Sequence, residues 1–346
     1  MSLPMKMLSV LFLALCLAWS ECPLEAAPGQ HRGQPIIFDT DIGNSTDDLF
    51  ALDLLYKMMD SGIVDLKGII VERTGAGYAD LADIENTYYG YPRIPIGIDR
   101  HGIANSRIFI DYRMLDELKN PDGSKMFKRT DTNLNDNIEG YKLYRKILAE
   151  AKDSSVKIVA VGFVSSIVQL LESAPDEYSE LPGRELVRQK VDSLYFMGTK
   201  LGGSDNPGYN LGGDLPLARR FLNEWPSQVM VYLSPSPVGD AIEYLPEEVL
   251  SDMEAIAVHP IKQTNMHKDC NTGQKMWDSL CVINAVYPQM FSYSGHGFVS
   301  LTEDDKIMFT EHPRGNFIYQ LPGDKDWNAK QLALLKSYLK SSQEKH

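Results

Sequence analysis

Short apolar runs alternate with amphipathic stretches along most of this chain. The apolar runs are short and bounded by turn residues, which predicts strands near 36–38, 64–71, 94–98, 156–162, 191–197 and 228–233. Apolar residues at helical spacing predict helices over 48–59, 80–88, 136–151, 167–173, 215–225, 278–287 and 329–339. Strands that alternate with helices indicate a parallel sheet covered on both faces. We therefore predict a single α/β domain over 35–340 with a mostly parallel central sheet, and a small C-terminal hairpin near 299–309.

Four carboxylates gather where the first predicted strand ends and the first helix begins: Asp39, Asp41, Asp47 and Asp48. In open α/β sheets, ligands bind outside this edge. Carboxylates so close together repel one another, and a hard cation within reach of Asp41 and Asp48 would relieve that repulsion. A plainer interpretation makes Asp47 or Asp48 a helix N-cap and Asp39 a solvated strand end. Capping needs one carboxylate, however, and here there are four.

Composition suits a globular protein and argues against one class of partner. The 346 residues are 43% hydrophobic and 10% aromatic, enough for a sizeable core. The net charge of −13 and the pI of about 5.0 argue against nucleic-acid binding through a general phosphate footprint. We predict a small-molecule substrate and no nucleic-acid partner, and the sequence leaves a homo-oligomer open.

The N-terminus has the features of an export signal. Lys6 precedes an apolar run over 7–19 that is too short for a comfortable membrane span. We predict a signal peptide over 1–20, with a cleavage site there or as far as about residue 26, and a secreted or periplasmic protein. No later stretch is long and apolar enough to cross a membrane, so we expect no membrane contact once the signal is removed.

Two of the four cysteines, Cys270 and Cys281, allow two interpretations. In an oxidising compartment, Cys270 and Cys281 could pair and close a short loop. Alternatively, Cys281 is a small buried hydrophobe in an apolar stretch.

Five motifs in order carry a family resemblance: Asp-x-Asp-x-Gly at 39–43 with Asp-Asp-x-x-Ala-Leu at 47–52, Tyr-Tyr-Gly at 88–90 before 94–97, Val-Gly-Phe-Val-Ser-Ser at 161–166, Pro-Gly-Tyr-Asn at 207–210 with Asp214, and Met-Trp-Asp at 276–278. Together they resemble the inosine-uridine preferring nucleoside hydrolases, which are calcium-dependent N-ribohydrolases. The likeness covers roughly 35–322. It implies a Rossmann-like fold with a Ca²⁺ ion at the base of a ribose pocket.

The resemblance also implies a role for each matching residue. The calcium ligands would be Asp41, Asp48, the backbone carbonyl near Ser165, and Asp278. The ion would chelate the sugar's diol and a water, with Asp41 as the base and with Asp47 and Asn210 hydrogen-bonded to the sugar. Trp277 would stack on the nucleobase, or is simply a core aromatic at a helix start. Carboxylates would stabilise the positive charge that develops on the sugar.

Several positions depart from the family pattern in the residues that grip the sugar. Ser45 replaces an Asp, the stretch 75–77 lacks an Asn, Gly208 replaces a Glu, and Pro237 stands where relatives often carry Glu. Each lost buried hydrogen bond would cost about 1–3 kcal/mol of affinity. Either the substrate differs, or loops at 100–134 or 259–275 supply other contacts. We expect the two histidines of the second loop, His259 and His267, at the surface, and the alternative is that one of them reaches the leaving group.

Three functions follow from these observations. The first is hydrolysis of the N-glycosidic bond of a ribonucleoside or related N-glycoside. The second is a catalytically impaired, calcium-containing protein that binds a diol-bearing ligand, which the lost sugar contacts favour. The third is a phosphohydrolase, which we rank last because no Lys or Arg stands early in the corresponding loops to hold a phosphate.

Overall fold

The computed structural model describes residues 33–43, 45–75, 77–103, 111–131, 133–134, 137–267 and 272–341. All of them belong to one compact unit. The predicted signal peptide and leader, and Cys270, lie outside the described residues. Cys281 is buried and free. No helix in the described ranges combines the length and the apolar character that a membrane span requires.

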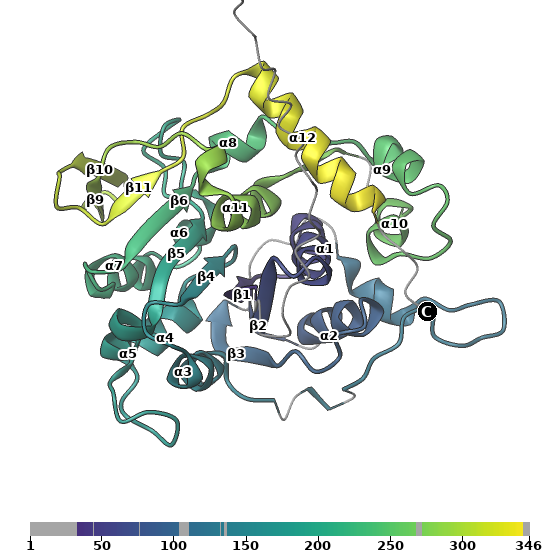
Figure 1. Cartoon of the computed structure of the whole chain (residues 1–346), viewed down its shortest axis with the longest axis horizontal. Helices are drawn as coiled ribbons and strands as arrows, with labels where there is room; N and C mark the ends of the chain where they lie inside the picture. The colour runs from purple at the N-terminus through teal and green to yellow at the C-terminus, as the bar shows by residue number, and fades with distance from the viewer. Residues whose placement is uncertain are drawn as a thin grey trace, which may run out of the picture. The chain divides into compact units, whose positions relative to one another are not determined.

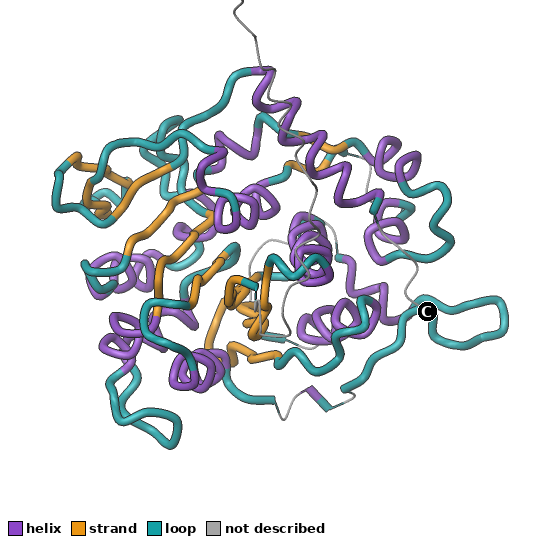
Figure 2. The backbone as a smooth tube through the Cα atoms, in the orientation of Figure 1, coloured by secondary structure: helices purple, strands orange, loops and turns teal. Residues whose placement is uncertain are grey.

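A nine-stranded sheet runs through the unit in the order β10-β9-β11-β6-β5-β4-β1-β2-β3 (Figures 1 and 2). Neighbouring strands from β3 across to β11 pair in parallel, whereas β9 and β10 form an antiparallel hairpin at one edge. The predicted fold class and hairpin are therefore confirmed. The strands are β1 (Gln34–Thr40), β2 (Val64–Arg73), β3 (Ile96–Ile103), β4 (Val156–Ala160), β5 (Val191–Met197), β6 (Met230–Ser234), β9 (Gly297–Leu301), β10 (Ile307–Glu311) and β11 (Phe317–Tyr319).

Helices cover both faces of the sheet and create two cores. On one face lie α1 (Asp47–Asp60), α2 (Tyr78–Tyr88) and α11 (Trp277–Val286), with α12 (Lys325–Lys340) packed on α1. On the other lie α3 (Gly140–Glu150), α4 (Ser165–Glu172), α5 (Gly183–Lys190) and α7 (Leu215–Glu224). Strand β1 contributes side chains to both cores, because successive side chains of a strand point to opposite faces. Ile36 and Phe38 pack in the first core and Ile37 in the second.

Short elements complete the chain. They are α6 (Gly208–Gly212), α8 (Ser236–Asp240), α9 (Pro246–Asp252) and α10 (Pro260–Asn265), the 3₁₀ helices at Tyr112–Glu117 and Pro288–Met290, and a two-stranded ribbon of β7 (Glu243–Tyr244) and β8 (Gln274–Lys275). Most of them lie in the connections that follow the carboxyl ends of β3, β5 and β6. They supply several residues of the site described below.

The strand order reverses between β1 and β4. The chain proceeds from β1 to β2 and β3 on one side, and then returns to place β4, β5 and β6 on the other. The connections that leave β1 and β4 diverge at this switch point, which leaves a crevice outside their carboxyl ends. Asp41 and Val161 are the first residues after these two strands. The fold thus delivers the acidic stretch of the sequence to the place where a ligand site is expected.

Two glycines allow the close approach of loops at this crevice. Gly43 has φ +108°, and a Cβ there would lie 2.4 Å from the ring of Tyr78. A Cβ on Gly162 would lie 2.6 Å from the backbone nitrogen of Asp41. Any larger residue at either position would displace the loop that carries Asp41.

The expected surface location of His259 is wrong. Its side chain is fully buried. His259 is the N-cap residue of α10, and its Nδ1 accepts a hydrogen bond from the Ile261 N–H at 3.2 Å. Its Nε2 lies 3.1 Å from the Tyr89 hydroxyl and 3.5 Å from Asp53 Oδ1. Burial lowers the pKa of His259, and the polar loop around it gives no sign of this burial in the sequence. His267 is half-buried.

Candidate active site

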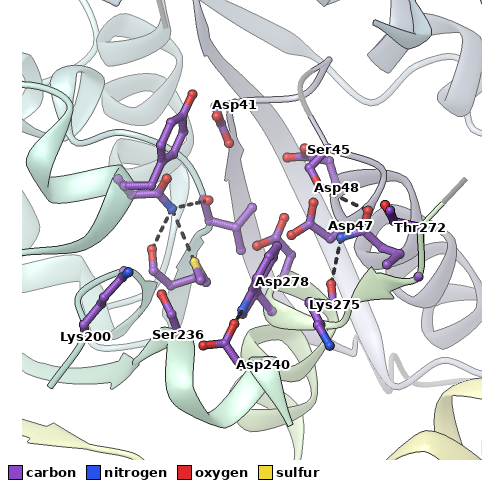
Figure 3. A pocket seen from close by; sticks show the side chains of 18 residues that line it. Asp41, Ser45, Asp47, Asp48, Lys200, Ser236, Asp240, Thr272, Lys275 and Asp278 are labelled. Carbon is purple, nitrogen blue, oxygen red and sulfur yellow. Dashed lines mark hydrogen bonds between the residues drawn. The ribbon is translucent and has the colours of Figure 1, made fainter. Parts of the chain in front are cut away.

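A cavity of about 460 Å³ opens at the switch point (Figure 3). This volume is in the usual range for small-molecule sites. Six of the seven site residues expected from the sequence line it: Asp41, Asp47, Asp48, Asn210, Trp277 and Asp278. The structure brings them together from the loop after β1 and from α1, α6 and α11, across 237 positions of sequence between Asp41 and Asp278. Ser165 is not part of the lining.

Asp47, Asp48 and Asp278 converge in this cavity. One carboxylate oxygen of each lies within 4.8 Å of the others, and all three side chains are buried. Asp47 and Asp48 stand in the first turn of α1 and Asp278 in the first turn of α11, and these two helices pack together. The partial positive charge of a helix N-terminus favours carboxylates there.

The three carboxylates suit one hard cation. Oxygens that share a Ca²⁺ at its usual ligand distances are at most about 5 Å apart, which matches their spacing here. Burial raises the pKa of Asp47 to about 7, with help from the repulsion of Asp41. Burial raises the pKa of Asp48 and Asp278 well above the usual range, and repulsion among the carboxylates adds to it. A bound cation would favour the charged form of these three carboxyl groups, so it would lower their pKa values and ionise them.

Neighbouring side chains orient Asp48 within this group. The Thr40 hydroxyl donates a hydrogen bond to Oδ1 of Asp48. The Tyr112 hydroxyl lies 3.4 Å from Oδ2 and itself accepts a hydrogen bond from the Gly43 N–H at 2.6 Å. The end of β1, the loop and the 3₁₀ helix of Tyr112 therefore hold one carboxylate in place.

Gln274 ties the acidic loop to the ribbon on the far side of the cavity. Its Oε1 accepts hydrogen bonds from the Ser45 hydroxyl at 3.0 Å, the Thr46 N–H at 3.1 Å and the Thr46 hydroxyl at 2.7 Å. Sequence reasoning missed this residue because 228 positions separate it from Thr46. Ser45, a departure from the family pattern, is thus part of a local hydrogen-bond network at the cavity wall.

Arg73 is the second residue that sequence reasoning missed. It ends β2 beside β1, and only 1% of its side chain is exposed. Its Nη2 lies 3.1 Å from Oδ2 of Asp41, while its Nε donates a hydrogen bond to the Asp41 carbonyl at 2.7 Å. Burial raises the pKa of Asp41, and the charge of Arg73 opposes that rise. An arginine at the end of a mostly apolar strand was the signal available in the sequence.

A second group of buried carboxylates, which is not part of the cavity lining, surrounds Ser165. Its hydroxyl is hydrogen-bonded to both Glu72 and Asp99, donating to one and accepting from the other, and both carboxyl groups are buried. Asp39 accepts a hydrogen bond from the Tyr144 hydroxyl at 2.6 Å, and burial raises its pKa to about 8. Ser165 is buried at the start of α4, and the proposed role of its carbonyl stays a prediction.

Hydrogen bonds also fix Asn210 and Trp277, the two remaining lining residues that the sequence predicted. The amide nitrogen of Asn210 donates to the carbonyls of Val161 at 2.7 Å and Met197 at 2.9 Å. This orients the amide, so its oxygen is the atom suited to accept a hydrogen bond from a ligand hydroxyl. The Trp277 ring is half-buried, and its Nε1 donates to Asp240 at 3.0 Å. The indole face thereby has a defined orientation at the cavity.

Solved structures of similar architecture were found. A purine-preferring ribonucleoside hydrolase from Gardnerella vaginalis aligns over 89% of this chain and 100% of its own, with a TM-score of 0.65 and 13% identity. An inosine-guanosine nucleoside hydrolase aligns over 89% and 99%, with a TM-score of 0.66 and 15% identity. The chain has the nucleoside hydrolase fold. The type III effector protein XopQ, solved in complex with adenosine diphosphate ribose, aligns over 90% and 95%, with a TM-score of 0.61 and 14% identity.

At the level of sequence, no family model and no curated protein matches the chain. The similarity to solved nucleoside hydrolases is thus one of fold, at sequence identities of 12–15%. At such identities the likeness establishes architecture.

Proposed function

We propose that the protein hydrolyses the N-glycosidic bond of a ribonucleoside or a related N-glycoside, with Ca²⁺ as cofactor. The observation that carries this proposal is the convergence of Asp47, Asp48 and Asp278 in a cavity at the switch point. The structural neighbours that are nucleoside hydrolases support it at the level of fold.

The residues present fit a calcium ion. The donor oxygens of Asp47, Asp48 and Asp278 are hard, buried and close enough to share one ion, so these three would hold it. When bound, Ca²⁺ would acidify water and engage the diol of a sugar. Asp41 and the carbonyl near Ser165, which the family resemblance adds to the ligand set, belong to this proposal as further candidates.

The chain's own residues would perform three tasks. Asp41, which lines the cavity, would accept a proton from the attacking water. The remaining carboxylates would stabilise the positive charge that builds on the sugar as the bond to the base breaks. The Asn210 amide oxygen would accept a hydrogen bond from a sugar hydroxyl, and the Trp277 ring would stack on the leaving base.

A panel of nucleosides and other N-glycosides tests this proposal. Purified protein with Ca²⁺ should release free base and reducing sugar from at least one member. Asp48→Asn should abolish the release, because it removes a carboxylate from the cation group, and a chelator should do the same. Asp176→Asn is the matched control: this carboxylate pairs with Arg145, outside the cavity, and the variant should keep the wild-type rate. Folded, calcium-supplied protein that turns over no member of the panel would overturn the proposal.

A second candidate is binding of a diol-bearing ligand without turnover. The neighbour solved with adenosine diphosphate ribose favours it, since that ligand carries ribose diols on the same architecture. Adenosine diphosphate ribose that raises the melting temperature and stays intact, with no nucleoside cleaved, would select this function over hydrolysis.

Export is the remaining part of the proposal. Lys6 and the apolar run over 7–19 support it. Expression of the full chain, followed by N-terminal sequencing of the mature protein, should find the first residue between about 21 and 27. A retained Met1 in a fully folded intracellular product would contradict it.

A further inference from the structure

Lys200 lies in the cavity wall, and the proposed mechanism gives it no task. Five aspartates and two lysines line the cavity in the part of the chain that the structure describes. The other lysine, Lys275, pairs with Glu243 at 3.0 Å. Lys200 is exposed, and no carboxylate among the described residues forms an ion pair with it. The cavity therefore presents one positive charge that its own carboxylates leave available for a ligand.

The backbone around Lys200 is held in place although the side chain reaches solvent. The Lys200 N–H donates a hydrogen bond to the Asn206 carbonyl at 3.2 Å, and the Lys200 carbonyl accepts one from the Gly203 N–H at 2.9 Å. The preceding carbonyl, that of Thr199, accepts hydrogen bonds from the N–H of Ser236 at 3.0 Å and from its hydroxyl at 3.1 Å. The Lys200 side chain thus starts from a defined point of the cavity wall.

Thr199 adopts a strained conformation next to this point. It is fully buried, has φ +75°, and stands between two lining residues, Gly198 and Lys200. A β-branched residue rarely adopts the left-handed region, and such strain is typical of functional sites. A Cβ on Gly208 would lie 2.8 Å from the Thr199 backbone nitrogen, so position 208 has no room for a side chain. The Glu of the family pattern is absent there, and no carboxylate at that position repels an anion near Lys200.

Lys200 lies away from the carboxylates that would hold Ca²⁺. Figure 3 shows Lys200 and Ser236 on one side of the cavity, and Asp47 and Thr272 on the opposite side. In a ribose ring the two diol carbons form one edge, while the base and the exocyclic carbon C5 leave from the carbons that flank it. A sugar held by its diol at the cation would therefore direct both groups away from it. With the base at Trp277, the group on C5 is the one left for Lys200.

We propose that the substrate is an N-glycoside whose sugar carries a phosphate on its exocyclic carbon, such as a nucleoside 5′-phosphate, and that Lys200 binds this phosphate. The inference rests on the proposed function and narrows its substrate class. A lysine ammonium offers three donors and a full charge to phosphate oxygens. The reaction stays a hydrolysis at C1: the hydroxyl of water joins C1, its proton ends on the leaving base, and the bonds to phosphorus stay intact. The products are a free base and a sugar phosphate.

Calorimetry with Ca²⁺ present tests the phosphate contact without turnover. Ribose 5-phosphate should bind the wild-type protein at least about tenfold more tightly than ribose does, and Lys200→Gln should remove that difference, because a charge-assisted hydrogen bond is lost. Lys275→Gln is the matched control: this lysine lines the same cavity but is paired with Glu243, so the difference should persist. Ribose 5-phosphate that binds wild type no more tightly than ribose, or a preference that both variants lose equally, would overturn the inference.

Steady-state kinetics compare a nucleoside 5′-phosphate with the same nucleoside lacking the phosphate. Wild type should have the higher kcat/KM for the phosphate. Lys200→Gln should lower that value roughly 10–100-fold and leave the value for the plain nucleoside within about threefold. Lys200→Arg should keep most of the preference, because it keeps the charge. Equal losses on both substrates would assign Lys200 to the leaving base or to the fold, and release of inorganic phosphate would indicate a different reaction; either result would overturn the inference.

These measurements separate failure of the inference from failure of the proposed function. A wild type that cleaves the plain nucleoside as fast as the phosphate, at rates that Lys200→Gln leaves unchanged, would overturn the inference and support the proposed function. A wild type that cleaves neither would refute the proposed function, and the ribose 5-phosphate titration would still decide the role of Lys200. Because Lys200 is exposed, both of its variants should fold.

Discussion

Asp47 should make the metal-free protein less stable as the pH rises. Burial raises the pKa of this carboxyl from its ordinary value of 3.8 to about 7. A group with a raised pKa in the folded state binds its proton more tightly there than in the unfolded chain. Its contribution to stability is fully present below pH 3.8 and is lost as the pH rises through about 7.

The size of the effect follows from the interval between the two pKa values. About three pH units separate them, and each is worth ~1.4 kcal/mol for one proton. The free energy of unfolding should therefore fall by roughly 4 kcal/mol between pH 4 and pH 7 on account of Asp47. Asp47→Asn also weakens the repulsion on Asp48 and Asp278, which adds a change of the same sign.

Urea unfolding in the presence of a chelator measures this effect. The quantity to follow is the difference in unfolding free energy between wild type and Asp47→Asn, at steps between about pH 4 and 7. It should decline across the range. With saturating Ca²⁺ the decline should disappear or reverse, because protons then compete with the cation for the carboxylates.

Asp176 serves as a control with the opposite sign. Its hydrogen bond with Arg145 lowers the pKa of this carboxyl, so its contribution to stability is lost only as the pH falls below its ordinary value of 3.8. The difference between wild type and Asp176→Asn should thus stay flat between about pH 4 and 7. A flat difference for Asp47→Asn as well would refute the burial argument for Asp47.

Three further predictions concern the scaffold of the site. Lys57→Met should destabilise the protein by about 3–5 kcal/mol in urea unfolding, because it leaves the buried Asp53 without its cation, and Lys57→Arg should restore part of the loss. Gly162→Ala should lower both stability and Ca²⁺-dependent turnover, since its Cβ would lie 2.6 Å from the Asp41 backbone nitrogen; a variant with the stability and rate of wild type would contradict the contact. Gln274→Leu should lower Ca²⁺ affinity about tenfold in calorimetry by freeing the acidic loop, and an unchanged affinity would show that the loop needs no anchor.

The sequence predicted the main elements well where the apolar signal was strong. The strand expected over 191–197 is β5, with the same bounds, because seven residues in its run are mostly apolar and pack into both cores. The helix expected over 48–59 is α1, which extends one residue further at each end. Helix α5 was missed, because only Leu186 and Val187 of its side chains carry a strong apolar signal. The elements α8, α9 and α10 are too short for a period to be visible.

The residues of the candidate site, too, were predictable from the sequence only in part. Asp41, Asp47 and Asp48 were found from residues alone, because a strand end places them within eight positions of one another. Asp278, Asn210 and Trp277 could be reached only through motifs that resemble a known family. Arg73 and Gln274 were missed, because no local pattern tells where a long polar side chain points or which distant loop accepts it.

The sequence by itself determined the alternation of strands and helices and the crowd of carboxylates at the end of the first strand. Both are local properties: periodicity and proximity along the chain are sufficient to predict them. Only the tertiary structure decided which carboxylates meet. It groups Asp47 and Asp48 with Asp278, and it pairs Asp41 with Arg73. Burial and Coulomb interactions depend on distance through space, so the pKa values and the division of roles appear only once the sheet has brought these side chains together.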